Sequence, residues 1–343
     1  MTRILLIINP NAGQTTVAEF EEALAAEMTR LQDIDPDRGA IQIDKLIPES
    51  PEQMRTTLRQ QCAQNLVDIL GVVGGDGTIM EVLPVLVEFP AVKLALIAYG
   101  TGNLLAVNLG IPKDFAGAID TLLTGRPRRI DMARINNDYF ALLAGVGAVA
   151  DIMESTPRAD KKRFGILAYV INGIRTVWSA RRSRFKITTE NRTFRARGVS
   201  VLVSNAASFL GPCVPLTPDA EPDDGLLDVC IIRSRSNRDY FSTLLEAILQ
   251  PASTLMARNI VHFKTRKLRI ESTKTLNVQA DGNIIGTTPV DIEIICNRLQ
   301  VMVPLQAFEG PSLPKEDSKT SLLDTLKCYL ETARQTAQSG LTD

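Results

Sequence analysis

The sequence has little of several residue types, and each shortage excludes a class of protein. It contains five cysteines among 343 residues, and they are scattered without a CxxC pair. An odd, unpaired set of this kind is typical of a reduced protein without a disulfide framework or a structural zinc site. The chain has one histidine, His262. A histidine-rich metal centre is therefore excluded, and acid–base chemistry is expected to depend on carboxylates or lysines.

Long hydrophobic runs are also missing. The longest apolar runs are about six residues, well short of the roughly 20 that span a bilayer. Met1-Thr2-Arg3 leads directly into a strand-like run, which is not the pattern of a signal peptide. With 45% hydrophobic and 22% charged residues, the composition is that of an ordinary globular protein. We expect a cytoplasmic protein, and its length suits two domains.

The net charge is −1, yet one segment is strongly basic. Between Arg158 and Lys186 there are nine basic residues and one acidic residue, Asp160. Aromatic and aliphatic residues are interleaved with them from Phe164 to Trp178. Such a basic amphipathic helix is typical of an element that lies on a membrane surface, although a helix packed on the core fits the pattern equally well. Nucleic acid is the poorer partner, because no reader motif is present.

Three turns rich in glycine and asparagine each follow an apolar, strand-like run. They are Asn9-Pro10-Asn11-Ala12-Gly13, Gly74-Gly75-Asp76-Gly77-Thr78 and Gly100-Thr101-Gly102-Asn103. In an open parallel sheet, ligands bind outside the carboxyl ends of the strands. Glycines there let backbone N–H groups approach phosphate oxygens. Three such turns on one sheet predict a single cleft for a nucleotide.

The turn from Gly74 to Thr78 is the most informative of the three. Its glycines can take positive φ and leave room for phosphate, and Asp76 can bind Mg²⁺ or hold the loop. Thr78 is expected to cap the following helix, whose positive end favours phosphates. The turn is neither a Walker A loop nor the dinucleotide-binding GxGxxG. An ordinary left-handed turn between a strand and a helix is the alternative explanation.

The order of elements predicts the fold class. Up to residue 125, strands and helices alternate, which indicates a doubly wound parallel α/β domain. Beyond it, short alternating segments separated by turns indicate a β-sandwich-like domain. We expect domains at 1–125 and 126–305, a linker at Gly125-Arg126-Pro127, and a helical tail at 306–343 that packs on the first domain. The expected strands are 4–8, 41–47, 68–73, 94–99, 129–135, 139–143, 185–189, 199–204, 228–232, 267–271, 276–280, 290–295 and 300–303, and the expected helices are 16–31, one from Pro51 with Ser50 as its cap, 78–89, 114–124, 164–180, 239–249 and 318–337.

Together these motifs resemble the diacylglycerol kinase/sphingosine kinase catalytic-domain family, over roughly residues 3–305. Besides the three turns, with Glu81 and Ala106, the similarity extends through Asp131, Gly145-Val146-Gly147, Pro218–Asp228 and Val278–Gly282. The resemblance implies a two-domain fold with the active site in the cleft between the domains. It also implies ATP and Mg²⁺ as cofactors and a lipid hydroxyl as the phosphate acceptor.

The resemblance also assigns roles to single residues. Asp281 would be the base that takes the proton of the acceptor hydroxyl, and a plain Asp-Gly hairpin turn is the alternative. A structural Mg²⁺ would be bound by Glu221, Asp224 and the Leu226 carbonyl, and an acidic solvated turn is the alternative. Lys161 or Lys162 would pair with Asp131. The nucleotide would be bound by Asn9, Pro10, Asn11, Ala12, Gly13, Gly74, Gly75, Asp76, Gly77, Thr78, Glu81, Gly100, Thr101, Gly102 and Asn103.

One residue departs from the family pattern, because Asn283 stands where the family has the glutamate of its Asp-Gly-Glu element. The sequence predicts a lipid kinase that visits the inner membrane face and uses MgATP, with diacylglycerol as the first choice of acceptor. Sphingoid bases, ceramide-like lipids and phosphatidylglycerol stay open as acceptors, as does a homodimer. Asn283 keeps a catalytically weak ATP- or lipid-binding regulator as an alternative. An NAD kinase, which shares the Gly-Gly-Asp-Gly turn, fits less well.

Overall fold

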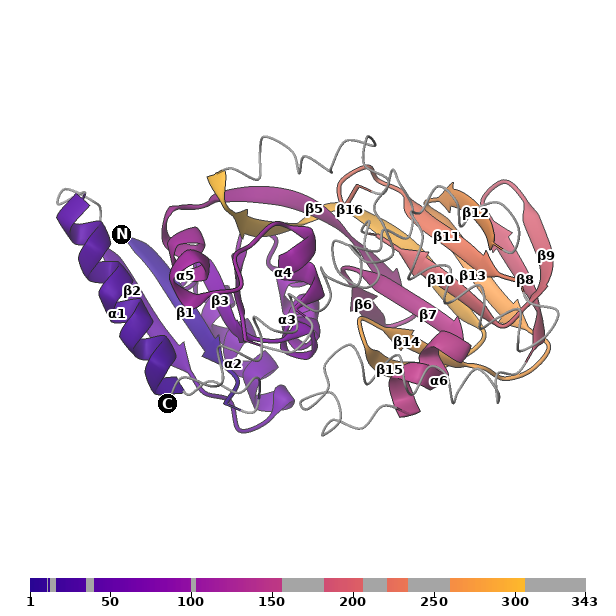
Figure 1. The fold of residues 1–343 in the computed structure, drawn as a ribbon, viewed down its shortest axis with the longest axis horizontal. Coiled ribbons are helices and arrows are strands. Elements are labelled where there is room, and N and C mark those ends of the chain that lie inside the picture. The colour runs from indigo at the N-terminus through magenta and orange to yellow at the C-terminus, as the bar shows by residue number, and fades with distance from the viewer. Residues whose placement is uncertain are drawn as a thin grey trace, which may run out of the picture.

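The computed structural model describes residues 1–10, 12, 17–34, 40–99, 103–155, 182–205, 221–233 and 260–305. Figure 1 shows a first region in which helices surround parallel strands and a second region made mainly of strands. The helices expected at 164–180, 239–249 and 318–337 lie outside the described residues, as does the tail 306–343.

The first domain is built on four adjacent parallel strands in the order β2-β1-β3-β4. The doubly wound α/β architecture predicted from the sequence is confirmed. Every element expected there is present, and the short helix α4 is an addition. The elements are β1 (Thr2–Ile8), α1 (Val17–Ile34), β2 (Ile41–Leu46), α2 (Pro51–Ala63), β3 (Ile69–Gly74), α3 (Asp76–Glu88), β4 (Lys93–Ala98), α4 (Leu104–Asn108) and α5 (Phe115–Thr124).

Helices cover both faces of this sheet, and strand β1 shows why its sequence is uninterruptedly apolar. Leu5 and Ile7 pack in one buried cluster with residues of α2 and α3. Ile4, Leu6 and Ile8 pack in a second cluster with residues of α1 and α5. A parallel strand buried on both faces has no solvent side, so it carries no alternating polar residues.

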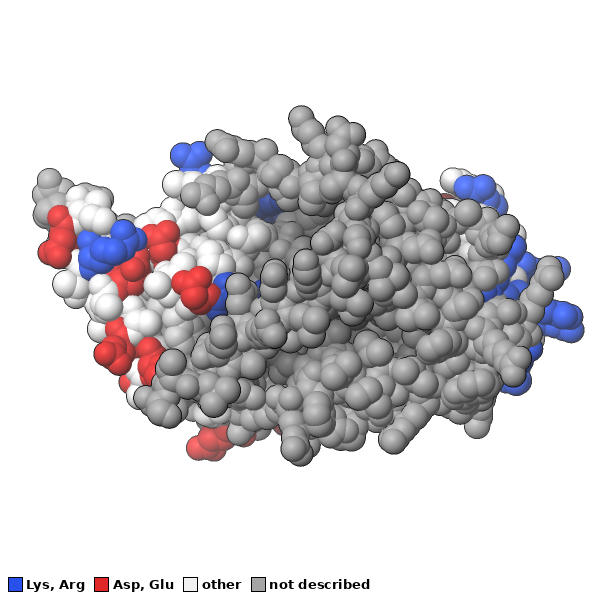
Figure 2. Space-filling view, viewed as in Figure 1, with Lys and Arg blue, Asp and Glu red and all other residues white. Residues whose placement is uncertain are grey.

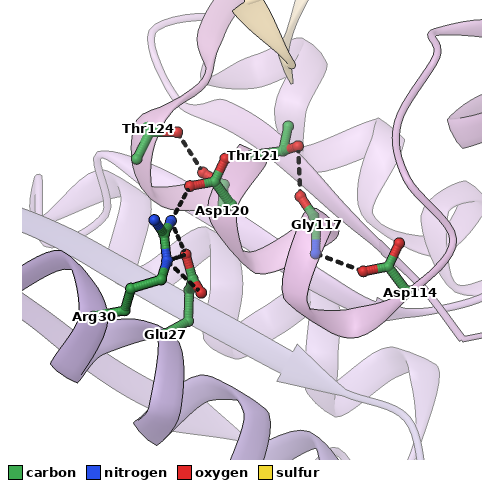
Figure 3. Close-up of polar contacts among 7 residues, drawn as sticks. All are labelled: Glu27, Arg30, Asp114, Gly117, Asp120, Thr121 and Thr124. Carbon is green, nitrogen blue, oxygen red and sulfur yellow. Dashed lines mark hydrogen bonds and ion pairs between the residues drawn. The ribbon is translucent and has the colours of Figure 1, made fainter.

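Figure 3 shows how α1 is joined to α5 by polar contacts. Arg30 on α1 forms ion pairs with Glu27 of its own helix and with Asp120 of α5, the latter at 2.7 Å. The Asp114 carboxylate accepts a hydrogen bond from the Gly117 N–H at 2.8 Å and so caps α5. Caps of this type stabilise a helix by about 1 kcal/mol.

The second domain is a sandwich of two sheets, as the sequence predicts. The larger sheet continues from the first domain in the order β2-β1-β3-β4-β16-β13-β8-β9, and the smaller one has the order β12-β11-β10-β7-β14-β15. Strands β7, β9, β12 and β15 and helix α6 are not among the expected elements, and the two strands expected at 290–295 and 300–303 form one strand. The elements are β5 (Arg126–Ile135), β6 (Asp138–Phe140), β7 (Leu143–Gly147), α6 (Ala148–Ser155), β8 (Ser183–Thr189), β9 (Thr193–Gly198), β10 (Ser200–Ser204), β11 (Leu227–Ile232), β12 (Ile260–Thr265), β13 (Lys267–Ser272), β14 (Asn277–Ala280), β15 (Asn283–Thr287) and β16 (Val290–Val303).

Two long antiparallel strands, β5 and β16, connect the domains. Their pairing runs from Arg126 opposite Val303 to Ile135 opposite Ile292, and the end of β16 also pairs with β4. The expected linker is therefore wrong, because β5 begins at Arg126 and the chain leaves the first domain as a strand. Gly125 is required by a close approach instead, since a β-carbon there would lie 2.4 Å from the Thr121 carbonyl oxygen.

The charged surface differs between the two ends of the molecule. Figure 2 shows acidic side chains gathered mainly at the end formed by the first domain and basic ones at the opposite end, where β8 and β9 lie. Arg184, Lys186, Arg195 and Arg197 on these two strands are all exposed. Among the described helices, none combines the length and the apolar character needed to cross a membrane.

Candidate active site

The predicted turns meet at one edge of the first sheet, since β1, β3 and β4 are parallel neighbours. The Asn9 N–H donates to the Val73 carbonyl at 3.0 Å, and the Asn9 side-chain amide donates to the Thr78 hydroxyl at 2.9 Å. The Tyr99 N–H donates to the Gly74 carbonyl at 3.0 Å. The structure thus joins the starts of all three turns. Five of the predicted nucleotide-binding residues lie outside the described residues, namely Asn11, Gly13, Gly100, Thr101 and Gly102.

The glycines of the central turn provide space rather than an unusual backbone conformation. Gly75 precedes α3 with an extended backbone (φ −103°), and neither Gly74 nor Gly77 has positive φ, so the alternative of an ordinary left-handed turn does not hold. A β-carbon on Gly74 would lie 2.7 Å from the Thr78 hydroxyl oxygen. At Gly77 a β-carbon would meet nothing within 4 Å. The first turn of α3 therefore borders open space. The cap expected from Thr78 is wrong, because α3 begins at Asp76 with Gly75 at the cap position and no side-chain cap bond.

Asp76 holds two of the turns together. One of its carboxylate oxygens accepts a hydrogen bond from the Leu104 N–H at 3.1 Å, and the other faces the Leu105 N–H at 3.4 Å. Both amides lie at the start of α4, directly after the third turn. Burial raises the pKa of Asp76, while the backbone N–H groups of residues 103–105 act in the opposite direction. Of the two roles that the sequence leaves open, this geometry supports holding the loop.

Asp281 stands in the turn between β14 and β15, in the left-handed region with φ 43°. Its two oxygens accept hydrogen bonds at 2.7 Å from the Ala141 and Leu143 N–H groups, and the Leu142 N–H contributes a third bond at 3.1 Å. The Asp281 N–H donates back to the Leu143 carbonyl at 2.8 Å. The carboxylate is thus fixed by consecutive amides on the segment between β6 and β7.

The environment of Asp281 strongly favours its protonated form. Burial raises the pKa of Asp281 to about 7, with a further contribution from the charge of Asp76, although the three amides lower it. The two carboxylates belong to different domains, yet the charge of Asp76 contributes to the raised pKa of Asp281. Met80 of α3 also packs against the cores of both domains. The structure therefore brings the Asp281 turn to the side of the first domain where Asp76 lies.

Other predicted residues have more local roles. Glu81 forms an ion pair at 2.8 Å with Arg55 of α2, which joins α2 to α3. The Ala12 N–H donates to the Asn9 carbonyl at 3.1 Å and closes the first turn around Pro10. Asn103 is buried and has the left-handed conformation, with φ 49°, just before α4.

The predicted metal loop, residues 221–226, is engaged by cationic side chains. Asp224 accepts one hydrogen bond from the Leu226 N–H at 2.9 Å and forms an ion pair with Lys264 at 2.7 Å. Asp223 pairs with Arg128 at 2.9 Å. Within the described part of the chain, no group of three or more His, Cys, Asp or Glu side chains is placed to bind a metal ion.

Asn205 was not predicted from the sequence, yet it supports the segment whose amides bind the Asp281 carboxylate. This residue is 1% exposed, and its side-chain amide donates to the carbonyls of Asp131 and Ala141 at 2.8 and 3.1 Å. It thereby positions the segment whose amides hold Asp281. The available signal was a polar Ser204-Asn205 pair directly after an apolar strand.

Comparison with known proteins supports the same architecture. Residues 3–135 match the diacylglycerol kinase catalytic domain, and residues 141–303 match the YegS C-terminal NAD kinase beta sandwich-like domain. A Streptococcus pneumoniae protein, a lipid kinase by its name, is 27% identical over 318 residues, which are 92% of this chain and 100% of the relative. A Staphylococcus epidermidis protein named diacylglycerol kinase is 25% identical over 315 residues, 92% of this chain and 96% of the relative.

A solved structure shows the same fold. The crystal structure of a diacylglycerol kinase from Bacillus anthracis has a TM-score of 0.67 at 21% identity and covers 89% of this chain and 97% of that one. The matched regions include all three nucleotide turns and the Asp281 turn. The chain therefore belongs to the diacylglycerol kinase-like family, with the catalytic domain of that family followed by its β-sandwich domain.

Proposed function

We propose that this protein is an ATP- and Mg²⁺-dependent lipid kinase that transfers the γ-phosphate to a lipid hydroxyl, with diacylglycerol as the preferred acceptor. One observation carries the proposal. A carboxylate with its pKa raised to about 7, Asp281, is held rigidly by three amides where the second domain faces Asp76 and the nucleotide turns.

Asp281 has the properties that a general base for an alcohol needs. A base works best when its pKa lies near the operating pH, because it is then both deprotonated and basic enough to take the proton. An ionised carboxylate has about four lone-pair positions. The amides of Ala141, Leu142 and Leu143 use up to three of them, which leaves one for an incoming hydroxyl.

The first domain has the features of a phosphate site. Helix α3 begins without a side-chain cap, so the positive end of its dipole favours anionic oxygens near Gly77. A β-carbon at Gly77 would meet nothing within 4 Å, so this position offers open space for a phosphate to approach. These residues fit the phosphates of ATP, which with Mg²⁺ supplies the phosphoryl group. Asn9 and Asp76 fix the surrounding turns, so phosphate binding needs little rearrangement.

The choice of acceptor and the membrane visit are supported by resemblance and by charge. The Staphylococcus epidermidis relative is named diacylglycerol kinase. The segment expected to lie on the membrane falls mostly outside the described residues, and its described end contributes the exposed cations Arg182, Arg184 and Lys186. Exposed cations favour anionic lipid surfaces by about 1 kcal/mol each.

The proposal is tested with γ-labelled ATP and a panel of acceptors in mixed micelles: diacylglycerol, a sphingoid base, ceramide, phosphatidylglycerol and no lipid. We expect label in phosphatidic acid, dependent on Mg²⁺. Label in another lipid would support lipid kinase activity but contradict diacylglycerol as the acceptor. Equal ADP release with and without every lipid would contradict a lipid kinase.

A second candidate is a catalytically weak regulator that binds ATP and lipid. It is favoured by Asn283, which is exposed at the start of β15 and provides no carboxylate two residues after Asp281. A regulator would show ATP-induced thermal stabilisation but no acceptor-dependent turnover, and Asn283→Glu would then restore turnover. Adding NAD to the acceptor panel tests the NAD kinase alternative in the same assay.

A further inference from the structure

The acidic loop at residues 221–226 poses a chemical question, because the family resemblance implies a divalent cation there. A hard cation requires carboxylate oxygens that are free to coordinate it. Asp224, the central candidate ligand, uses one oxygen to accept the Leu226 N–H at 2.9 Å and the other to bind the Lys264 ammonium at 2.7 Å. A divalent ion at this carboxylate would have to displace a cation that the protein itself supplies.

Lys264 serves a second carboxylate as well. It stands directly opposite Asp228 in the register of β12 and β11, and its ammonium lies 3.7 Å from an Asp228 oxygen. Asp228 is 2% exposed, so its charge needs a partner inside the protein. The other Asp228 oxygen lies 2.6 Å from the ring nitrogen Nε2 of His262. Lys264 therefore lies between the carboxylates of Asp224 and Asp228, where one positive charge stabilises both.

The rest of the loop is held without an ion. Asp223 is paired with Arg128 at 2.9 Å. The fully buried Asp131 carboxylate accepts the Gly225 N–H at 2.7 Å, and the Asp131 N–H donates to the Pro222 carbonyl at 2.7 Å. These bonds fix the sharp turn at Gly225, which has φ 72°. The shape of the loop and the charges of Asp223 and Asp224 are thus accounted for by groups of this chain, while Glu221 is exposed.

We propose that Lys264 is a built-in counter-ion that takes the place of a divalent cation in the acidic loop, so that the second domain folds without Mg²⁺. The structural-metal prediction from the sequence and this proposal differ in a measurable way, since they assign opposite Mg²⁺ responses to the nucleotide-free protein. The proposal is independent of the kinase reaction, because it concerns stability in the absence of ATP and lipid.

The test is thermal unfolding of the full chain without nucleotide, in EDTA, in MgCl₂ and in NaCl of equal ionic strength. We expect the wild-type Tm to be the same in all three. Lys264→Met should lower the Tm in EDTA by about 2–6 °C, and Mg²⁺ should restore part of that loss because Asp224 and Asp228 then face an empty position. Lys264→Arg keeps the positive charge and should stay insensitive to Mg²⁺.

Lys267→Met is the matched control. Lys267 begins the next strand, is more than half exposed and has only a 3.7 Å contact with Glu293, so its loss should shift the Tm by less than about 1 °C. Access of Mg²⁺ to residue 264 should not limit the test, because Lys264 lines a cavity of about 330 Å³ together with Arg192 and Arg266.

Three results would overturn the proposal. The first is a wild-type Tm that rises with Mg²⁺ but not with NaCl. The second is a Lys264→Met variant as stable in EDTA as Lys267→Met. The third is a destabilised Lys264→Met variant that no divalent ion restores, since the lysine would then not occupy a cation's place. If Lys264→Met fails to fold, calorimetric titration of the wild type decides: no Mg²⁺ heat supports the proposal, and one stoichiometric site contradicts it.

Discussion

The two carboxylate-bearing turns, at Asp76 and at Asp281, are built alike and do different things. Each carboxylate is partly buried, each accepts hydrogen bonds from consecutive backbone amides of another segment, and desolvation raises the pKa of each. Asp76 ties together two loops of one domain. Asp281 stands on a hairpin of the other domain and has short bonds to its amides. We therefore predict that the same arrangement supports a binding loop in one case and presents a base in the other.

The largest expected effect comes from Asp281→Asn. If Asp281 takes the acceptor proton, kcat should fall by about 10²–10⁴-fold while ATP affinity stays nearly unchanged. The measurement is steady-state kinetics beside an ATP-binding melt. Asp291→Asn, the same substitution at an exposed position of the second domain, should leave kcat unchanged. Near-normal turnover in Asp281→Asn would show that the turn is only structural.

Asp76→Asn should affect binding more than chemistry. The amide replaces one acceptor oxygen by a donor that faces the Leu104 or Leu105 N–H, so we expect a loss of about 1–3 kcal/mol of stability. ATP should bind roughly tenfold more weakly, because about 1.4 kcal/mol is a factor of ten. Asp114→Asn, at a helix cap where asparagine is well tolerated, is the control. Unchanged ATP affinity in Asp76→Asn would remove it from the nucleotide site.

Two substitutions in the same turn, Gly74→Ala and Gly77→Ala, should have smaller effects on stability that differ in sign. Gly74→Ala places a methyl group 2.7 Å from the Thr78 hydroxyl oxygen and should cost about 1–3 kcal/mol of stability. Gly77→Ala meets nothing within 4 Å and should slightly stabilise α3, by about 0.5–1 kcal/mol, yet weaken ATP binding. Calorimetric unfolding and ATP titration would separate the two. Equal ATP binding by Gly77→Ala and the wild type would place the phosphates elsewhere.

A further prediction is a pH dependence with opposite signs for activity and stability. Because the folded pKa of Asp281, about 7, is above the ordinary value of 3.8, the folded chain binds more protons than the unfolded chain between these values. The Asp281 contribution to stability is therefore present below the ordinary carboxyl pKa and is lost as the pH rises through about 7. Over the same range kcat/KM should rise as the base ionises. Asp281→Asn should flatten the stability change, and an unaltered slope would refute the shifted pKa.

Much of the fold could be predicted because the decisive signals are local. The apolar runs of β1, β3 and β4 and the Ser50-Pro51 start of α2 are visible in a few neighbouring residues, and the Ser50 hydroxyl does accept the Gln53 N–H. Strand β9 was missed because as a charged edge strand, Thr-Phe-Arg-Ala-Arg-Gly, it lacks an apolar run. Strand β15 was missed because most of its residues are exposed.

The site was predictable in position but not in detail. The turns follow from strand order, whereas the role of Asp76 depends on amides 28 and 29 residues further along the chain. The amides that bind the Asp281 carboxylate lie 138 to 140 positions earlier in the chain. Likewise, nothing near Asp224 in the sequence indicates Lys264, which stands 40 residues later. Such long-range contacts carry no local pattern.

The paired strands β5 and β16 determine how the molecule can open and close. Two domains on a flexible linker rotate freely, but here any relative motion must bend a hydrogen-bonded ribbon. The ribbon has one weak point, the irregularity between Ile295 and Leu299, where Asn297 donates to Asp131 at 2.6 Å and Arg298 donates to the Val87 carbonyl at the end of α3 at 3.0 Å. A bulge bends more easily than a regular ladder. Flexing is thus concentrated at a joint that contacts both the nucleotide-side helix and the buried aspartate beneath the acidic loop.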